Sequence, residues 1–254
     1  MFLAQICVYN CTDNLMTVCL YFLVLSSLSS LHLYFIILLL SVPGKVFAHI
    51  ILARIKPTLL SHRRLQQSGF TPGHSTCDRI ETLCNIAQRR QDFGHPTFAA
   101  FVDLRAAFDS LSRPALWLLL TRLGIPDKIV RLFRVMYDNS VSCVRTGGTH
   151  SSWFKIEAGV RHGCVLAPDS FTTGMDWLLD RTVESCSIGV TFGQSSFTDP
   201  DFADDVSLLT ELLELLVTIL EAMASEAASL GLEVNWQSLR GQKCKLWVAG
   251  SICH

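Results

Sequence analysis

The sequence has no surplus of basic residues, because 21 Lys and Arg stand against 22 Asp and Glu, which gives a formal net charge of −1 at pH 7. Proteins that bind nucleic acid usually carry a basic excess that neutralises phosphates. The charge is unevenly spread along the chain, however. Residues 1–40 contain no Lys or Arg, whereas the stretch that follows is rich in them (Arg54, Lys56, Arg63, Arg64, Arg89 and Arg90). Two interpretations stay open for that stretch: a local basic patch or a solvated helix face.

The ten cysteines lack the spacing of a metal site, since the sequence has no CxxC pair and no Cys/His group at zinc-like intervals. Cys77, Cys84, Cys143 and Cys164 stand among apolar or small neighbours, where a free thiol behaves as a small hydrophobe. We therefore expect reduced thiols without disulfide partners. This favours an intracellular protein of the cytoplasm or nucleus.

Charged residues are absent from Leu15 to Leu40, a stretch long enough to cross a bilayer as a helix. No Lys or Arg precedes it, which argues against a cleavable signal peptide. Two interpretations remain: a transmembrane helix, or a leader over residues 1–40 that a rearranged or wrongly assembled gene has joined to the functional chain. We favour the second, so a membrane location depends only on residues 15–40.

The rest of the chain alternates between helical and strand-like patterns, and half of all residues are apolar. Helical periodicity predicts helices over 44–60, with a bend or an end at Pro57, and over 79–90, 114–123, 127–137, 168–181 and 211–230. Short apolar runs predict strands at 97–103, 141–145, 153–156 and within 197–209. Strands covered by helices indicate an α+β fold.

Three carboxylates stand out because apolar residues precede them. Asp103 ends the run Ala-Phe-Val, and Asp204 and Asp205 follow Phe-Ala. A strand end and a hairpin tip could bring these oxygens together, and hard oxygen ligands suit Mg²⁺. The alternative is a helix cap at Asp103 and an ordinary turn at the Asp-Asp pair.

Three segments, in this order and spacing, resemble the palm motifs of reverse transcriptases from non-LTR (LINE-type) retrotransposons. They are FVDLRAAFD at 101–109, GVRHGCVLAP at 159–168 and FADD at 202–205. The segment from Gln67 to Phe70, with Ser75, Thr76 and Asp78, is similar to the fingers of that family, and 231–235 is similar to the strand after the palm helix. The likeness runs from about residue 39 to 237.

This resemblance implies a right-hand polymerase, with fingers and a palm in which helices back a small antiparallel sheet. We expect partial fingers at 41–96, the palm at 97–237 and a divergent tail at 238–254, with the thumb missing. The implied function is that of an RNA-directed DNA polymerase fragment that extends a primer 3′-hydroxyl. The alternative is a truncated retrotransposon relic that folds, or binds nucleic acid weakly, and catalyses nothing.

The resemblance also assigns site residues. Asp103, Asp204 and Asp205 become the catalytic carboxylates that bind two Mg²⁺ ions, and Phe108 matches the ring that crowds a ribose 2′-hydroxyl. Arg161, His162 and Gly163 belong to the segment along the incoming nucleotide. The implied partners are an RNA template, a DNA primer and deoxynucleoside triphosphates. The sequence departs from the family at four places: His162 replaces Gln, His74 replaces Arg, Ala167 replaces Ser, and residues 237–241 lack the usual Lys.

Overall fold

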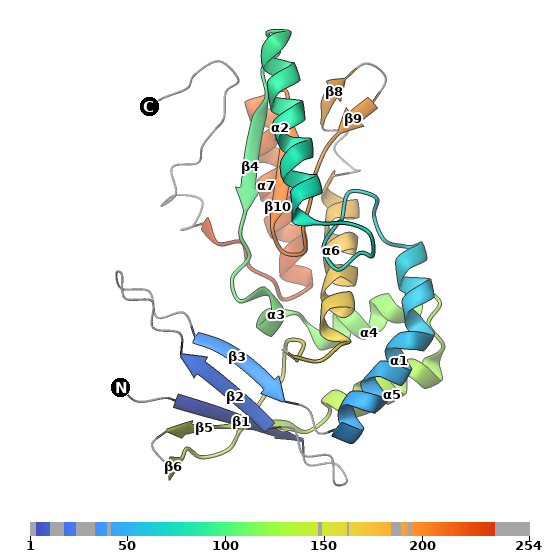
Figure 1. Ribbon diagram of the computed structural model, residues 1–254, viewed down its shortest axis with the longest axis vertical. Coiled ribbons are helices and arrows are strands. Elements are labelled where there is room, and N and C mark those ends of the chain that lie inside the picture. Colours follow the sequence, from blue (N-terminus) through green and yellow to red (C-terminus); the bar gives the residue numbers. More distant parts are fainter. Residues whose placement is uncertain are drawn as a thin grey trace. The chain divides into compact units, whose positions relative to one another are not determined.

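The chain forms two compact units that interleave along the sequence (Figure 1). Unit 1 contains residues 1–61 and 113–170, and unit 2 contains residues 62–112 and 171–254. In unit 1, Lys and Arg outnumber Asp and Glu by more than two to one, whereas acidic residues predominate in unit 2. The computed structural model describes residues 4–10, 18–23, 34–39, 42–146, 149–161, 163–183, 189–192 and 195–236.

Unit 2 is built on a two-stranded antiparallel sheet of β4 (Phe98–Val102) and β10 (Val206–Thr210). Two helices cover it, with α2 (Thr76–Asp92) in front of the strands in Figure 1 and α7 (Leu213–Ser229) behind them. All five residues of β10 are buried, as expected for a strand covered on both faces. The predicted α+β class is confirmed.

Helix α2 begins at a capping box, three residues before the start of the helix predicted over 79–90. The Ser75 hydroxyl accepts a hydrogen bond from the Asp78 amide, and the Asp78 carboxylate accepts one from the Ser75 amide. In the last turn, the buried Arg90 guanidinium donates hydrogen bonds to Thr97, to the carbonyls of Pro96 and Thr191, and to Glu211. One side chain therefore connects the helix to both strands at the same end of the sheet.

The remaining elements of unit 2 support the sheet. Helix α3 (Ala107–Ser110) follows β4, and a hairpin of β8 (Val190–Phe192) and β9 (Ser195–Phe197) precedes β10. Helix α6 (Ala167–Val183) begins in unit 1 and continues into unit 2, where Phe171, Met175, Leu178 and Leu179 are fully buried. These apolar side chains supply much of the driving force that holds unit 2 together.

A buried ion group connects the loop after residue 61 to helix α6 and to the segment between β9 and β10. The Arg64 guanidinium contacts Asp199, lies 2.7 Å from Asp180 and lies 3.6 Å from Asp201. Asp199 and Asp201 have no solvent exposure. Burial, together with the neighbouring Asp199, raises the pKa of the Asp201 carboxyl well above its ordinary value. Arg64 is thus the cation that makes two buried carboxylates tolerable.

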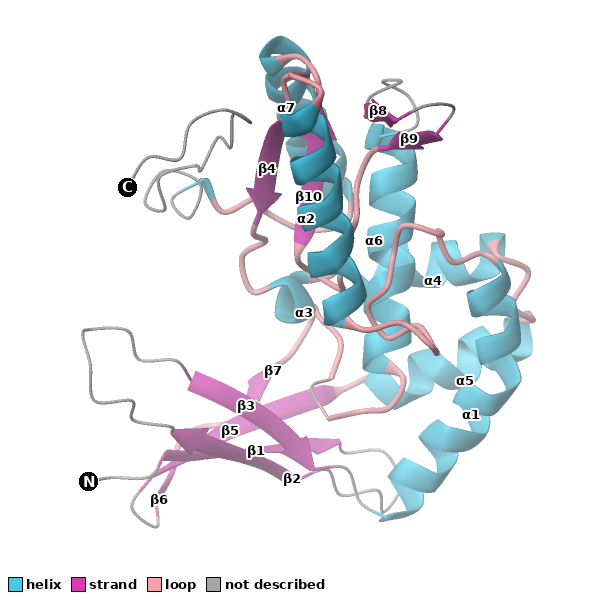
Figure 2. Cartoon of the chain, turned by 45° about the horizontal axis from the view of Figure 1, so that its top comes forward, coloured by secondary structure: helices cyan, strands magenta, loops and turns pink. Residues whose placement is uncertain are grey.

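Unit 1 combines helices with a sheet in which β5 (Ser140–Thr146) is central (Figure 2). Strand β5 pairs with β1 (Ala4–Asn10), β6 (Thr149–His150) and β7 (Phe154–Lys155). The strands predicted at 141–145 and 153–156 are confirmed, and they pair antiparallel as β5 and β7; the glycines at 147 and 148 lie outside the described residues. The helices of this unit are α1 (Val42–Ser61), α4 (Arg113–Arg122) and α5 (Asp127–Tyr137).

Three expectations need correction. Helix α1 continues through Pro57 and ends at Ser61, so the predicted end at the proline is wrong; Ile51 and Ile55 before the proline and Leu59 after it are all buried. Cys77 and Cys84 lie exposed on the polar helix α2, although Cys143 and Cys164 are buried as expected. Apolar neighbours in sequence do not imply a buried position when the helix turns that residue towards solvent.

The third correction concerns residues 15–40, for which we considered a membrane helix. The described parts of that stretch are the strands β2 (Val18–Leu23) and β3 (Tyr34–Leu39), which pair antiparallel. An apolar run with β-branched and aromatic residues suits a strand as well as a helix, and hydropathy alone does not distinguish the two. Across the described part of the chain, no helix has both the length and the apolar character that a membrane crossing requires.

The Arg64 ion group gives a stability prediction. Arg64→Met keeps most of the side-chain volume but leaves Asp199 and Asp201 buried without their cation, so we expect a loss of about 3–5 kcal/mol in the free energy of unfolding. Urea denaturation measures it. The matched control is Arg181→Met, which removes an exposed guanidinium 2.7 Å from Glu226 and should change stability far less. Equal losses in the two variants would contradict the role given to Arg64.

Candidate functional site

The register of the unit 2 sheet brings two of the predicted acidic residues together. Val102, the last residue of β4, pairs with Val206, the first residue of β10. If this register is continued by one residue, Asp103, which follows β4, lies opposite Asp205, which precedes β10. Neighbouring positions on antiparallel strands bring side chains to about 5 Å of one another. Residues that lie a hundred positions apart in the sequence therefore meet at one end of the sheet.

The third acidic residue, Asp204, lies in the tight turn that leads into β10. Phe202 and Asp205 exchange both backbone hydrogen bonds, each 3.0 Å long, and so close a two-residue hairpin around Ala203 and Asp204. Ala203 has a left-handed backbone with φ of 58°, which the primed turns of tight hairpins require at their first central residue. Ala203 is buried, whereas Asp204 and Asp205 are exposed.

A second segment holds Asp103 from the other side. Val234 forms a bridge with Leu104, and the Asn235 amide donates a 2.8 Å hydrogen bond to the Asp103 carbonyl. The side-chain amide of Asn235 also donates to the Asp103 carboxylate, at 2.8 Å. Asn235 therefore orients one carboxylate oxygen and leaves the other accessible. The sequence motifs include Asn235 but give no sign of this contact, which spans 132 residues.

The three carboxylates act on one another electrostatically. Partial burial raises the pKa of the Asp205 carboxyl, and the negative charges of Asp204 and Asp103 raise it further. A divalent cation would relieve this repulsion, and exposed oxygens at a strand end and a hairpin tip are the ligands that Mg²⁺ prefers. Within the described residues, no three His, Cys, Asp or Glu side chains yet converge closely enough to enclose an ion. The donor atoms therefore fit a divalent metal by their chemistry and not by their present spacing.

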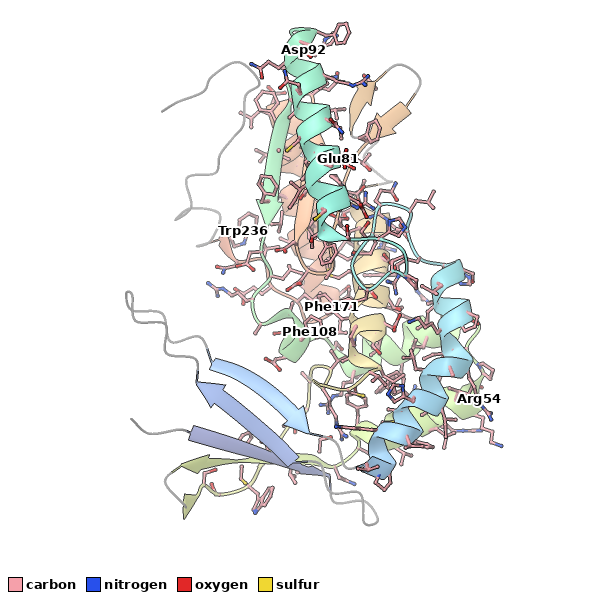
Figure 3. The ribbon with its side chains drawn as sticks, viewed as in Figure 1. Arg54, Glu81, Asp92, Phe108, Phe171 and Trp236 are labelled. Carbon is pink, nitrogen blue, oxygen red and sulfur yellow. The ribbon has the colours of Figure 1, made fainter. Side chains whose placement is uncertain are left out.

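Phe108 lies on α3, five residues beyond Asp103. Its ring stacks on the fully buried ring of Phe171, with centroids 4.3 Å apart and planes inclined by 17° (Figure 3). Phe108 itself is half-buried, so part of the ring faces away from the core. The stack limits rotation of the ring and fixes the position of its exposed edge.

The expected nucleotide segment belongs to unit 1. Arg161 is 5% exposed, and its guanidinium lies 5.1 Å from the Tyr137 ring and donates a 2.8 Å hydrogen bond to Ser140. Gly163 is exposed, with φ of 81°, a backbone conformation that glycine adopts without strain. His162 lies outside the described residues. The structure thus groups Asp103, Asp204, Asp205 and Phe108 in unit 2, and Arg161 and Gly163 in unit 1.

Comparison with known proteins identifies a family. The model described as "Reverse transcriptase (RNA-dependent DNA polymerase)" matches residues 34–248. The chain is 28% identical over 170 residues to the Pol polyprotein of the type-2 retrotransposable element R2DM of Drosophila melanogaster. The aligned region covers 67% of this chain and 16% of the relative. It is 26% identical over 200 residues to the RNA-directed DNA polymerase from the mobile element jockey of Drosophila funebris, over 76% of this chain and 21% of the relative.

Solved structures agree on the fold. The telomerase of Candida albicans, solved in complex with a fragment of telomeric RNA, aligns with a TM-score of 0.53 and 16% identity over 76% of this chain and 33% of the telomerase. The telomerase of Candida tropicalis aligns with a TM-score of 0.53 and 14% identity over 77% of this chain and 32% of its own length. The chain therefore has the right-hand polymerase fold expected from its motifs.

The electrostatic coupling gives a prediction that needs no activity. In metal-free buffer, Asp204→Asn removes one neighbouring negative charge, so the pKa of the Asp205 carboxyl should fall towards its ordinary value. Carboxyl ¹³C NMR titration measures this shift. Glu221→Gln, which removes an exposed carboxylate on α7, serves as the control and should leave the Asp205 titration unchanged. An Asp205 pKa that is the same in all three proteins would contradict the proximity of the acidic residues.

Proposed function

We propose a function from one premise: this chain belongs to the reverse transcriptase (RNA-dependent DNA polymerase) family, whose model spans residues 34–248. In this proposal it is the reverse transcriptase domain of a LINE-type retrotransposon and copies RNA into DNA by extending a primer 3′-hydroxyl. The chain covers 16% of the length of its R2DM relative and 21% of the length of its jockey relative. The observation that carries the proposal is the meeting of Asp103 and Asp205 beside the Asp204 turn.

The chemistry proposed for this site is an in-line phosphoryl transfer. Enzymes of this family are generally dependent on a divalent metal, and two Mg²⁺ ions would stabilise the charge on the attacking and leaving oxygens. Asp103 and Asp204 would be the main ligands, with Asp205 as the third carboxylate. Asn235 would keep the Asp103 carboxylate oriented while its free oxygen meets the metal. Catalysis would then consist mostly of positioning and charge stabilisation.

Selection of deoxynucleotides would depend on Phe108. The stack on Phe171 holds the Phe108 ring in place, so its exposed edge could exclude a ribose 2′-hydroxyl by contact. Arg161, His162 and Gly163 would line the path of the incoming deoxynucleoside triphosphate. Because the Arg161 guanidinium is committed to Tyr137 and Ser140, its part would be to fix the backbone of this segment.

The RNA template and DNA primer need a basic surface, and unit 1 offers one on α5. Its apolar residues Val130, Phe133 and Met136 face the core, while Lys128, Arg131 and Arg134 are exposed on the other side. These three cations recur every third position along the helix, close enough together to contact successive phosphates of one backbone. We assign them to the sugar-phosphate backbone of the template–primer duplex.

The catalytic proposal predicts a large loss of primer extension on an RNA template when Asp204 is changed to Asn. Metal-centred charge stabilisation is worth several kcal/mol, so the rate should fall by about two orders of magnitude or more. Glu221→Gln is the control and should keep the activity of the unchanged chain. Equal extension by the unchanged chain and Asp204→Asn would exclude catalysis at this site. Absence of extension in all three proteins would assign the chain to the catalytically inactive alternative.

The template proposal predicts a change in salt dependence. Replacing Lys128, Arg131 and Arg134 together by Gln should weaken binding of an RNA–DNA duplex and reduce the slope of log Kd against log salt by about one for each phosphate that the helix no longer neutralises. Fluorescence anisotropy at several KCl concentrations measures this slope. Arg181→Gln removes a cation that is already paired with Glu226 and should leave the slope nearly unchanged. An unaltered slope in the triple variant would refute the assignment of α5.

A further inference from the structure

We propose that Gln67 is a positioning residue for the acidic hairpin. Its side-chain amide holds the Ala203 peptide in the left-handed conformation that directs Asp204 and Asp205 towards the metal. The inference rests on the function proposed above, because it takes the hairpin to be the metal site. Gln67 lies in the fingers-like segment, 136 residues before Ala203, and its motif carries no mark of a contact with the carboxylates.

Both polar groups of the Gln67 amide are used on the hairpin. Its Oε1 accepts hydrogen bonds from the Ala203 amide at 2.8 Å and from the Gly69 amide at 2.7 Å. Its Nε2 donates to the Ala203 carbonyl at 3.2 Å. Gln67 is 1% exposed and Ala203 is 5% exposed, so water has little access to these bonds. One side chain thus satisfies both backbone polar groups of the turn residue.

The backbone around Gln67 is tied to the same hairpin. Gln67 forms a parallel bridge with Asp201, the Ser68 amide donates to the Asp201 carbonyl at 3.0 Å, and the Asp201 amide donates to the Gln66 carbonyl at 3.2 Å. The loop therefore lies along the strand that enters the turn. This backbone pairing fixes the position of the Gln67 side chain along the segment that contains Ala203, so its amide lies within hydrogen-bonding distance of the Ala203 peptide.

Gly69 shows how close the two segments lie. A Cβ atom added at this glycine would be 2.2 Å from the Ala203 nitrogen and 2.6 Å from its Cα, distances that real side chains do not reach. The loop can approach the turn this closely only because residue 69 has no side chain. The close approach of Gly69 and the hydrogen bonds of Gln67 therefore both involve the Ala203 peptide.

The strain at Ala203 explains why such support is needed. An alanine in the left-handed region is disfavoured by roughly 1–2 kcal/mol relative to ordinary backbone conformations. Two buried hydrogen bonds to its peptide groups offset this cost. Without them, the turn would relax towards negative φ and the carboxylates that follow would point elsewhere. A residue that touches no metal would then control the metal affinity.

The test measures binding of Mn²⁺ to the full chain by electron paramagnetic resonance, which needs no catalysis. Gln67→Ala should raise the Kd for Mn²⁺ by about tenfold or more, the range observed when residues that orient metal ligands are removed. Hydrogen exchange at the Ala203 amide should accelerate in the same variant, because its acceptor is gone. The matched control is Gln88→Ala, which removes an exposed glutamine bonded to Asp92 on α2 and should alter neither quantity.

A second substitution separates positioning from general damage. Ala203→Gly adopts positive φ without strain, so the double variant Gln67→Ala/Ala203→Gly should recover part of the Mn²⁺ affinity lost in Gln67→Ala. An unchanged Kd in Gln67→Ala, or a double variant as weak as Gln67→Ala, would overturn the proposal. Failure of the proposed function would give a different set of results. The unchanged chain would bind Mn²⁺ but would not extend a primer. Alternatively, the unchanged chain would bind no Mn²⁺, while hydrogen exchange at the Ala203 amide would still be faster in Gln67→Ala.

Discussion

The fold of unit 2 has to hold Asp205 near Asp103 and Asp204, although their negative charges disfavour ionisation of the Asp205 carboxyl. Because like charges repel, other contacts in the unit must hold these three residues near one another. The β4–β10 register supplies one support, and the Asn235 contact supplies the second. Buried apolar residues on α2, α6 and α7 hold the sheet that carries both. The positions of the three acidic residues are therefore set by the fold, and the stabilising contacts lie elsewhere in the unit.

Charged residues are divided unequally between the two units. Acidic residues predominate in unit 2, which contains the three candidate carboxylates, and basic residues predominate in unit 1. The near-zero net charge of the whole sequence hides this division completely. A net charge averaged over a chain is therefore a poor guide to nucleic-acid binding when acidic and basic residues predominate in different units.

Local patterns predicted most of the elements that position the site. The strand before Asp103 and the helix α5 were both predicted, because each depends on neighbouring residues, although β4 is only partly buried and its Phe101 is exposed. The strands in the apolar N-terminal stretch were not, since hydropathy favours either state. The partners of Arg64 and Asn235 could not be predicted either. Each contact joins residues more than a hundred positions apart, and only the folded register brings them together.

The buried arginines of unit 2 also limit how early this unit can fold during synthesis on the ribosome. Arg64 meets Asp199 across 135 residues, and Arg90 meets Glu211 across 121. Both guanidinium groups are therefore synthesised well before the carboxylates that neutralise them. Helix α2 can form early from its own cap, but the unit closes only after the FADD hairpin has left the exit tunnel. Translation must pass the last acidic residue of the site before the first one gains a fixed environment.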